Sequence, residues 1–145
     1  MTTELFEARY GQVFRSPMRG MILLACVFTL GFQLLILRLQ FRSHPGRMWL
    51  EDGTLYTDRG KLAAGVPAAQ CEIENVLPIL AKRRTQGFHL VLRHPDGRGG
   101  STKTYVNTNW IVGGPERLRG LLDALIAAGV GGAENARGVQ LQLQL

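Results

Sequence analysis

The chain has 145 residues, 46% of them hydrophobic, and carries 17 Lys and Arg against 11 Asp and Glu, a net charge of +6. This length suits one globular domain, and the basic balance suits an anionic membrane surface or nucleic acid as partner. Its two cysteines, Cys26 and Cys71, lie in unlike surroundings, so we expect neither a disulfide framework nor a cysteine-based metal site.

The N-terminal segment, residues 1–17, leads into a long apolar run. Phe6, Tyr10 and Phe14 follow one another at intervals of four residues, which is typical of one face of a helix. Two interpretations stay open here. The segment is either a short helix at a membrane interface, with its rings at headgroup level, or a partly ordered tail.

The apolar run extends over 18 residues, from Gly20 to Leu37, with no charge and one strongly polar side chain, Gln33. As a helix it would span about 27 Å, close to the hydrocarbon thickness of a bilayer. Arg19 precedes the run, and Arg38 and Arg42 follow it, so basic side chains are available at both ends. The sequence therefore predicts a transmembrane helix.

Three other interpretations of this run compete with a transmembrane helix. A signal peptide would need small residues after Leu37, and a lipoprotein signal would need a longer apolar stretch before Cys26. A buried core helix would show one apolar stripe, whereas this run is apolar on all faces. Because a Gln is costly in hydrocarbon unless it is paired, Gln33 is expected at a helix–helix contact. Three arginines on each side leave the orientation undecided by charge.

The segment after residue 46 changes to a period of two, which indicates strands. The stretch 48–51 and its return, 55–57, flank the turn Asp52-Gly53, a strong hairpin signal. The stretch 66–73 is expected to be extended, and 74–81 to be a strand or an irregular bridge. The clearest strand is 87–93, with a partner over 102–107.

A helix is predicted to close this domain. Gly114-Pro115-Glu116 resembles a helix start, and Gly129 is a suitable stop. Between them lies an apolar stripe, formed by Leu118, Leu121, Leu122 and Leu125. In the tail, Val139 to Leu145 alternates apolar residues with glutamines, so residues 130–145 are expected to be a flexible tail with an extra strand or a disordered end.

The order of these elements resembles bacterial pleckstrin-homology-like domains. The resemblance rests on Ile73-Glu74-Asn75-Val76 in mid-domain, the Asp-Gly hairpin, and a last helix led by Pro115-Glu116-Arg117-Leu118. It implies an α+β fold class. A transmembrane helix (18–42) precedes a mainly antiparallel domain (46–129) that a C-terminal amphipathic helix closes. It also implies a single-pass protein of the bacterial cytoplasmic membrane, with the domain in the cytoplasm.

Lys82-Arg83-Arg84 is a run of three basic residues, expected in a loop that contacts anionic lipid or a partner. The first hairpin is acidic at Glu51 and Asp52, which argues against specific phosphoinositide recognition. Aromatic residues are too few for a nucleic-acid surface.

No pattern of His, Cys or carboxylates suggests catalysis, a metal or another cofactor. We therefore expect a membrane-anchored, non-catalytic binding or scaffolding module. Its partners would be membrane lipids, another membrane protein or a second copy. The alternative is a small accessory subunit of a larger membrane complex, in which Gln33 packs against another helix.

Overall fold

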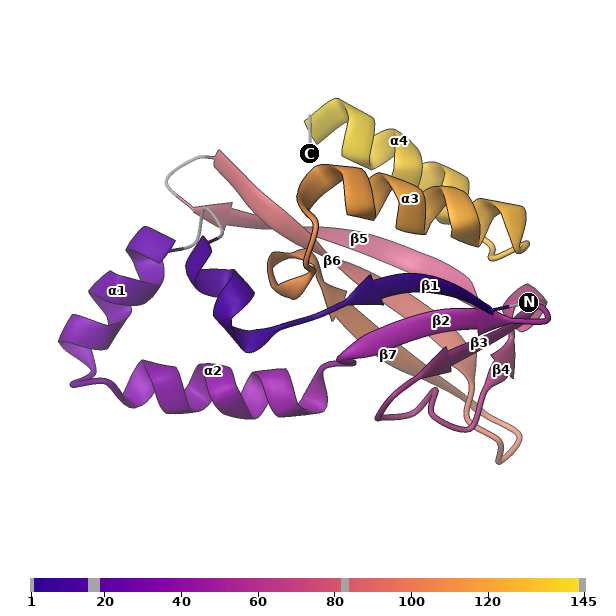
Figure 1. The fold of residues 1–145 in the computed structure, drawn as a ribbon, viewed down its shortest axis with the longest axis horizontal. Coiled ribbons are helices and arrows are strands. Elements are labelled where there is room, and N and C mark those ends of the chain that lie inside the picture. Colours follow the sequence, from indigo (N-terminus) through magenta and orange to yellow (C-terminus); the bar gives the residue numbers. More distant parts are fainter. Residues whose placement is uncertain (1, 16–18, 82–83, 144–145) are drawn as a thin grey trace.

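The computed structural model describes residues 2–15, 19–81 and 84–143 and has an α+β fold with two antiparallel sheets (Figure 1). The first sheet has the strand order β1-β2-β3-β4, made of Thr2–Glu7, Arg47–Glu51, Thr54–Thr57 and Val66–Pro67. The second has the order β5-β6-β7, made of Glu72–Ala81, Arg84–Pro95 and Ser101–Asn107. Of the predicted fold class, the α+β composition and the antiparallel strands agree with the structure.

The strands follow from turn chemistry and periodicity. Asp52 and Gly53 have φ of 50° and 78°, the left-handed conformation that a two-residue hairpin turn requires, and β2 and β3 pair across them. The ambiguous stretch 74–81 is part of β5. Its register shifts between Pro78 and Leu80, as expected beside a residue without an N–H group.

Helix α3 (Gly114–Ala127) buries the predicted leucine stripe. All four leucines are at most 5% exposed, and α3 packs against β1. Gly129 has a φ of 85° and ends the helix as predicted. The core beneath α3 draws apolar side chains from both sheets, among them Leu5, Phe6 and Leu92.

The predicted strand at the C-terminal end is wrong for the described part of the tail. Residues Ala133–Leu143 form helix α4, which lies beside α3 and packs against β5 (Figure 1). Among the side chains described in α4, over residues 133–140, the buried ones are Ala133, Ala136 and Gln140, at intervals of three and four residues. The helix therefore buries a face that the alternation of Leu and Gln does not mark.

The N-terminal segment is also corrected, because it begins with a strand. Strand β1 pairs with β2, and a short 3-10 helix, η1 (Tyr10–Arg15), follows it. The pairing shifts register between Glu4 and Phe6, and this bulge allows the successive residues Leu5 and Phe6 both to be buried. The interval of four residues between the aromatics reflects neither an interfacial helix nor a tail.

The apolar run forms a helical hairpin where a single transmembrane helix was predicted. Helix α1 (Arg19–Phe28) and helix α2 (Phe32–Ser43) meet at residues 29–31, where the chain turns back, and diverge from that turn (Figure 1). Their lengths correspond to about 15 and 18 Å, roughly half a bilayer's hydrocarbon core each. Within the described residues, no helix combines the length and apolarity that a membrane crossing requires.

The pairing of β1 with β2 explains this reversal. Glu7 is paired with Arg47, and the Ala8 N–H donates to the Gly46 carbonyl at 2.7 Å. The chain thus leaves the first sheet and returns to the same place, so both ends of the apolar run lie on one side. The predicted single-pass transmembrane topology, and the single-pass membrane localisation based on it, are therefore wrong.

Candidate functional site

The α1–α2 hairpin is the main exposed apolar feature of the described chain. Among the described residues, every exposed large apolar side chain except Tyr105 lies between Met21 and Leu39. Exposure is greatest around the tip, at Val27 (73%), Phe28 (78%) and Leu30 (97%). Monomeric proteins rarely expose a contiguous apolar patch of this kind unless it is a binding surface.

Several backbone polar groups at the tip of the hairpin are paired within the tip. The Thr29 hydroxyl donates to the Ala25 carbonyl (2.7 Å) and accepts from the Gln33 N–H (3.1 Å). The Gly31 N–H donates to the Cys26 carbonyl at 2.9 Å. Leu30 and Gly31 adopt positive φ, which closes the turn in two residues. Satisfied backbone groups are what an apolar environment demands of a chain that enters it.

Aromatic rings join the base of the hairpin to the domain. Tyr10 lies edge-on to both Phe14 and Phe41, and its hydroxyl donates to the Leu34 carbonyl in α2. Phe41 and His44 each lie edge-on to the buried Trp110, in the 3-10 helix η3 (Thr108–Trp110). The spacing of Tyr10 and Phe14 thus reflects packing beneath the hairpin.

Arg59 holds the C-terminal end of α2. Its Nε donates to the His44 carbonyl (2.7 Å) and its Nη2 to the Phe41 carbonyl (2.9 Å), while the guanidinium lies 5.0 Å from the centre of the Phe41 ring. A cation at this position satisfies free carbonyls and complements the helix dipole. The role of Arg59 in holding α2 could not be predicted from the sequence, because its partners lie 15 and 18 residues away.

Asp58 fixes the chain where it re-enters the first sheet. One carboxylate oxygen accepts from the backbone N–H groups of Gly46 (2.9 Å) and Arg47 (3.0 Å). A Cβ at residue 46 would lie only 2.6 Å from the other oxygen of Asp58, so this close approach requires glycine. The hairpin is therefore held rigidly at its base.

His44 is buried and neutral at the same junction. Its Nε2 accepts from the Asn107 N–H at 2.8 Å, so the proton is on Nδ1, which donates to the Pro45 carbonyl. Desolvation lowers its pKa from 6.5 to about 4, and the charge of Arg59 acts in the same direction. His44 therefore connects α2 to β7 without adding charge.

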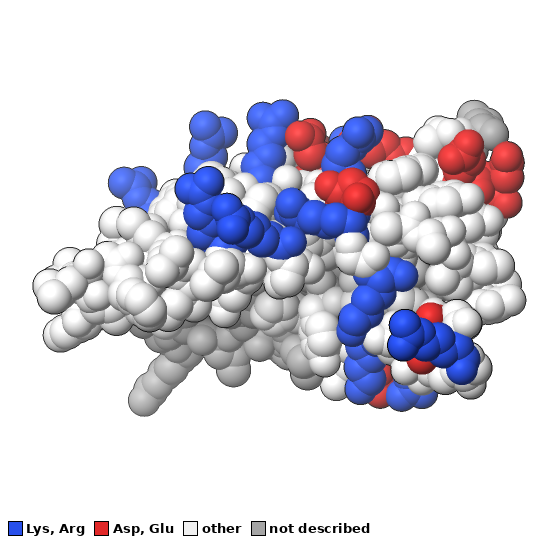
Figure 2. Space-filling model, turned by 90° about the horizontal axis from the view of Figure 1, so that it is seen from below, with Lys and Arg blue, Asp and Glu red and all other residues white. Residues whose placement is uncertain are grey.

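The arginines predicted to flank a transmembrane helix all lie along one hairpin. Arg19 begins α1, Arg38 and Arg42 lie in the second half of α2, and all three are exposed. Arg38 lies about 10 Å and Arg42 about 16 Å along α2 from Gly31. Figure 2 shows an uncharged hairpin end, with Lys and Arg side chains nearer the domain.

The other residues predicted to contact lipid or a partner are Gln33 and the basic run 82–84. Gln33 is half-buried in the first turn of α2, and a contact with another helix is untested. Lys82 and Arg83 lie outside the described residues, and Arg84 begins β6 without a described side chain. The expected role of this basic run in lipid or partner contact stays a prediction.

Cys71 and His94 both lie inside the domain. Cys71 is 2% exposed, and burial raises its pKa to about 11, which keeps the thiol protonated. His94 is buried, with Nε2 at 2.8 Å from the Thr104 hydroxyl. Among the residues described, no three His, Cys, Asp or Glu side chains gather as metal ligands would.

No protein-family model, curated protein or solved structure matches this chain. The predicted resemblance to anchored pleckstrin-homology-like proteins is therefore wrong. Its transmembrane helix is a hairpin, its N-terminal segment is a strand, and no relative supports the family.

Proposed function

We propose that this protein is a non-catalytic module that binds the surface of an anionic membrane, with the α1–α2 hairpin entering one leaflet. The observation that carries the proposal is the pairing of an uncharged apolar tip with arginines at the hairpin's base. This arrangement differs from the single-pass helix, because neither arm crosses the bilayer.

The dimensions and charges support this orientation. Arms of about 15 and 18 Å reach roughly the depth of one leaflet. With Leu30 deepest, Arg38 and Arg42 lie about 10–16 Å back along α2, where headgroups begin. Each basic residue near an anionic surface contributes about 1 kcal/mol. The acidic turn at Glu51 and Asp52 lies at the end of β2 away from the hairpin (Figure 1).

Burial of apolar side chains contributes more to the free energy of membrane binding than the charges do. Burying a large apolar side chain is worth about 1.5–3 kcal/mol, and several such side chains at the tip are now more than half exposed. Flotation with lipid vesicles tests the proposal. The full chain should float with phosphatidylcholine vesicles containing 30% phosphatidylglycerol, and more weakly with phosphatidylcholine alone.

Leu30→Asp is the decisive variant. Asp tolerates the left-handed conformation at residue 30, so the fold should be kept, while a charge replaces the deepest apolar side chain. We expect vesicle binding to fall at least tenfold. Ala69→Asp is the matched control, since it adds the same charge at an exposed residue next to the β2–β3 turn.

A second variant isolates the charge term. Arg19→Gln/Arg38→Gln should reduce the preference for phosphatidylglycerol and leave the weak binding to phosphatidylcholine unchanged. The proposal is overturned if the wild-type chain fails to float, or if Leu30→Asp binds as well as Ala69→Asp. Failure to float together with loss of self-association in Leu30→Asp would assign the hairpin to a second copy of the chain.

A further inference from the structure

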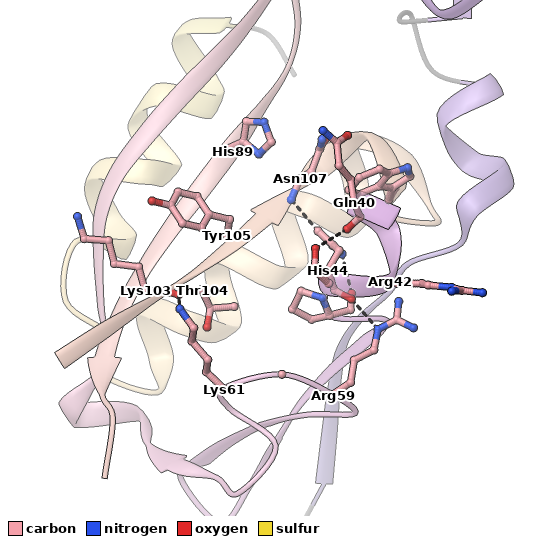
Figure 3. A pocket seen from close by; sticks show the side chains of 14 residues that line it. Gln40, Arg42, His44, Arg59, Lys61, His89, Lys103, Thr104, Tyr105 and Asn107 are labelled. Carbon is pink, nitrogen blue, oxygen red and sulfur yellow. Dashed lines mark hydrogen bonds between the residues drawn. The ribbon is translucent and has the colours of Figure 1, made fainter. Parts of the chain in front are cut away.

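A pocket of about 640 Å³ lies where the hairpin meets the domain (Figure 3). Its walls come from the C-terminal end of α2, the loop that follows β3, and strands β6 and β7. The size is that of a small-molecule site. The pocket lies at the level that the proposed orientation assigns to lipid headgroups.

The charge of this pocket is strongly positive. Four cationic side chains line it, and no carboxylate is among its described lining residues; the four are Arg42, Arg59, Lys61 and Lys103. In Figure 3 the two arginines lie on one side and the two lysines on the other. Glu74 forms an ion pair with Lys103 (3.1 Å), so the other three supply most of the net charge.

Two of the four cations stay available to a ligand. Arg59 is engaged with carbonyls of α2, and Asp58 lies close to it. Lys61 donates to the Lys103 backbone carbonyl at 3.1 Å, which leaves further ammonium protons for another acceptor. Arg42 is exposed, and no hydrogen bond or ion pair recorded for the described residues involves its guanidinium.

The pocket wall also holds two buried nitrogens that lack partners. Trp110 and His89 line the pocket, but Trp110 Nε1 and His89 Nδ1 are enclosed by the protein and have no hydrogen-bond partner among the described residues. Trp110 is only 4% exposed, and its indole N–H can only donate. Both nitrogens lie behind the pocket surface, so a ligand in the pocket would change the surroundings of the Trp110 ring without accepting a hydrogen bond from its N–H.

We propose that this pocket binds a phosphate group, with Arg42 and Lys61 contributing positive charge from two sides and the Trp110 ring lying in its wall (Figure 3). Phosphate oxygens accept several hydrogen bonds at once and suit guanidinium geometry. An anionic lipid headgroup is the expected source. That source rests on the proposed function, whereas the phosphate chemistry does not, because a soluble phosphate ester would make the same contacts.

Indole resonances in a nitrogen–proton correlation spectrum provide the first test. The chain has two tryptophans, and Trp49 stacks on Tyr56 outside the pocket. Titration with glycerol 1-phosphate at constant ionic strength should shift the Trp110 indole resonance progressively and leave that of Trp49 in place. Glycerol should shift neither, and Trp49→Phe assigns the two signals.

The variant Arg42→Gln/Lys61→Gln should weaken the Trp110 response at least fivefold. Arg98→Gln/Arg119→Gln is the control, because it removes two positive charges at exposed residues outside the pocket and should change the response less than twofold. No Trp110 response in the wild type, or equal responses in the two double variants, overturns the proposal.

Vesicle flotation distinguishes the two phosphate sources. With a lipid headgroup, the pocket variant should also lose most of its preference for phosphatidylglycerol over phosphatidylcholine. A normal preference, together with a lost Trp110 response, rejects the lipid source and assigns the pocket to a soluble phosphate ester. A Trp110 response in a chain that never floats removes the leaflet proposal and leaves the pocket. Flotation without a Trp110 response removes the pocket proposal and leaves the leaflet proposal.

Discussion

At the scale of single residues, His44 shows how a buried polar group connects parts of the chain. It is 5% exposed, and its two ring nitrogens bind Pro45 and Asn107, the latter 63 residues further on. The hydrogen bond from the Asn107 N–H requires an unprotonated Nε2. Protonation would replace this hydrogen bond with a clash of two donors inside the protein, so burial and geometry both favour the neutral form.

The stability of the protein should therefore fall in mild acid. The pKa of His44 is about 4 in the folded chain and 6.5 when unperturbed, so below pH 6.5 the unfolded chain binds a proton that the folded chain does not. Its contribution is complete above pH 6.5 and is lost as the pH falls towards about 4. The loss is on the order of 3 kcal/mol.

Urea unfolding at pH 7 and pH 4.5 measures this effect. Gln at residue 44 keeps an acceptor for Asn107 but does not titrate, so His44→Gln should lose less stability between the two pH values than the wild type. Burial also lowers the pKa of His89, so His89→Gln serves as the comparison. Identical pH profiles for the wild type and His44→Gln would contradict this assignment.

At the scale of elements, the hairpin and α4 show where local patterns mislead. The run from Gly20 to Leu37 is apolar and long enough to cross a bilayer, yet Leu30 and Gly31 reverse it. A leucine at positive φ is uncommon, so the sequence contains only Gly31 as a signal for this turn. The polar residue Thr29, which hydrogen-bonds on both sides of the turn, carries no turn signal by itself.

The alternation of apolar residues and glutamines in the tail suggested a strand, but this alternation does not correspond to strand pairing, because Ala133–Leu143 form a helix. Over residues 133–140 of α4, two alanines face the core, and Gln140 is fully buried beside Arg137, whose Nη1 donates to the Gln140 amide oxygen. By contrast, α3 was predicted correctly, since its apolar residues are large and helically spaced. A helix that packs through alanines exposes little pattern to sequence analysis.

Two glycines in the tail test whether it is packed as described. Gly132 has a φ of 75°, and a Cβ there would collide with the Ile73 carbonyl, so Gly132→Ala should cost about 2 kcal/mol or more. Gly138 lies within α4, and a Cβ there meets nothing within 4 Å. Gly138→Ala should therefore stabilise the chain by about 0.5–1 kcal/mol.

Thermal or urea unfolding of the two variants gives a matched comparison, since both exchange the same atoms six residues apart. A tail detached from the domain would leave both variants at wild-type stability. A destabilising Gly138→Ala would also contradict the helix.

At the scale of the molecule, the two sheets form the folded domain and the hairpin projects from it. The sheets, α3 and α4 share one core, and the hairpin extends from it (Figure 1). Aromatic packing at Phe41 and the bonds from Arg59 fix the direction of α2 relative to the domain. If the tip enters a leaflet, this rigid base sets which face of the domain lies against the headgroups.

Depth-dependent quenching measures this orientation. A fluorophore on Leu30→Cys should be quenched by nitroxides deep in the acyl chains and protected from aqueous iodide. A fluorophore on Asp52→Cys should behave in the opposite way. Cys26→Ala removes the half-buried thiol, whereas Cys71 can stay because its buried, protonated thiol is unreactive. Iodide quenching at residue 30 would contradict leaflet insertion.

The amino-acid sequence alone determined the local elements: the Asp52-Gly53 hairpin, strands β6 and β7, helix α3 and the existence of an uncharged apolar run with arginines around it. These depend on turn chemistry and on periodicity within a few residues. The basic pocket could not be predicted from the sequence, since its walls come from segments far apart in the chain.

The course of the apolar run was decided only by tertiary structure. Whether it crosses or reverses depends on where its two ends are held, and both are held by the pairing of β1 with β2. These strands lie about 40 residues apart, and neither their register nor their partner is encoded in a local pattern. The same pairing brings Arg19, Arg38 and Arg42 onto one hairpin, where the sequence had suggested opposite ends of a helix.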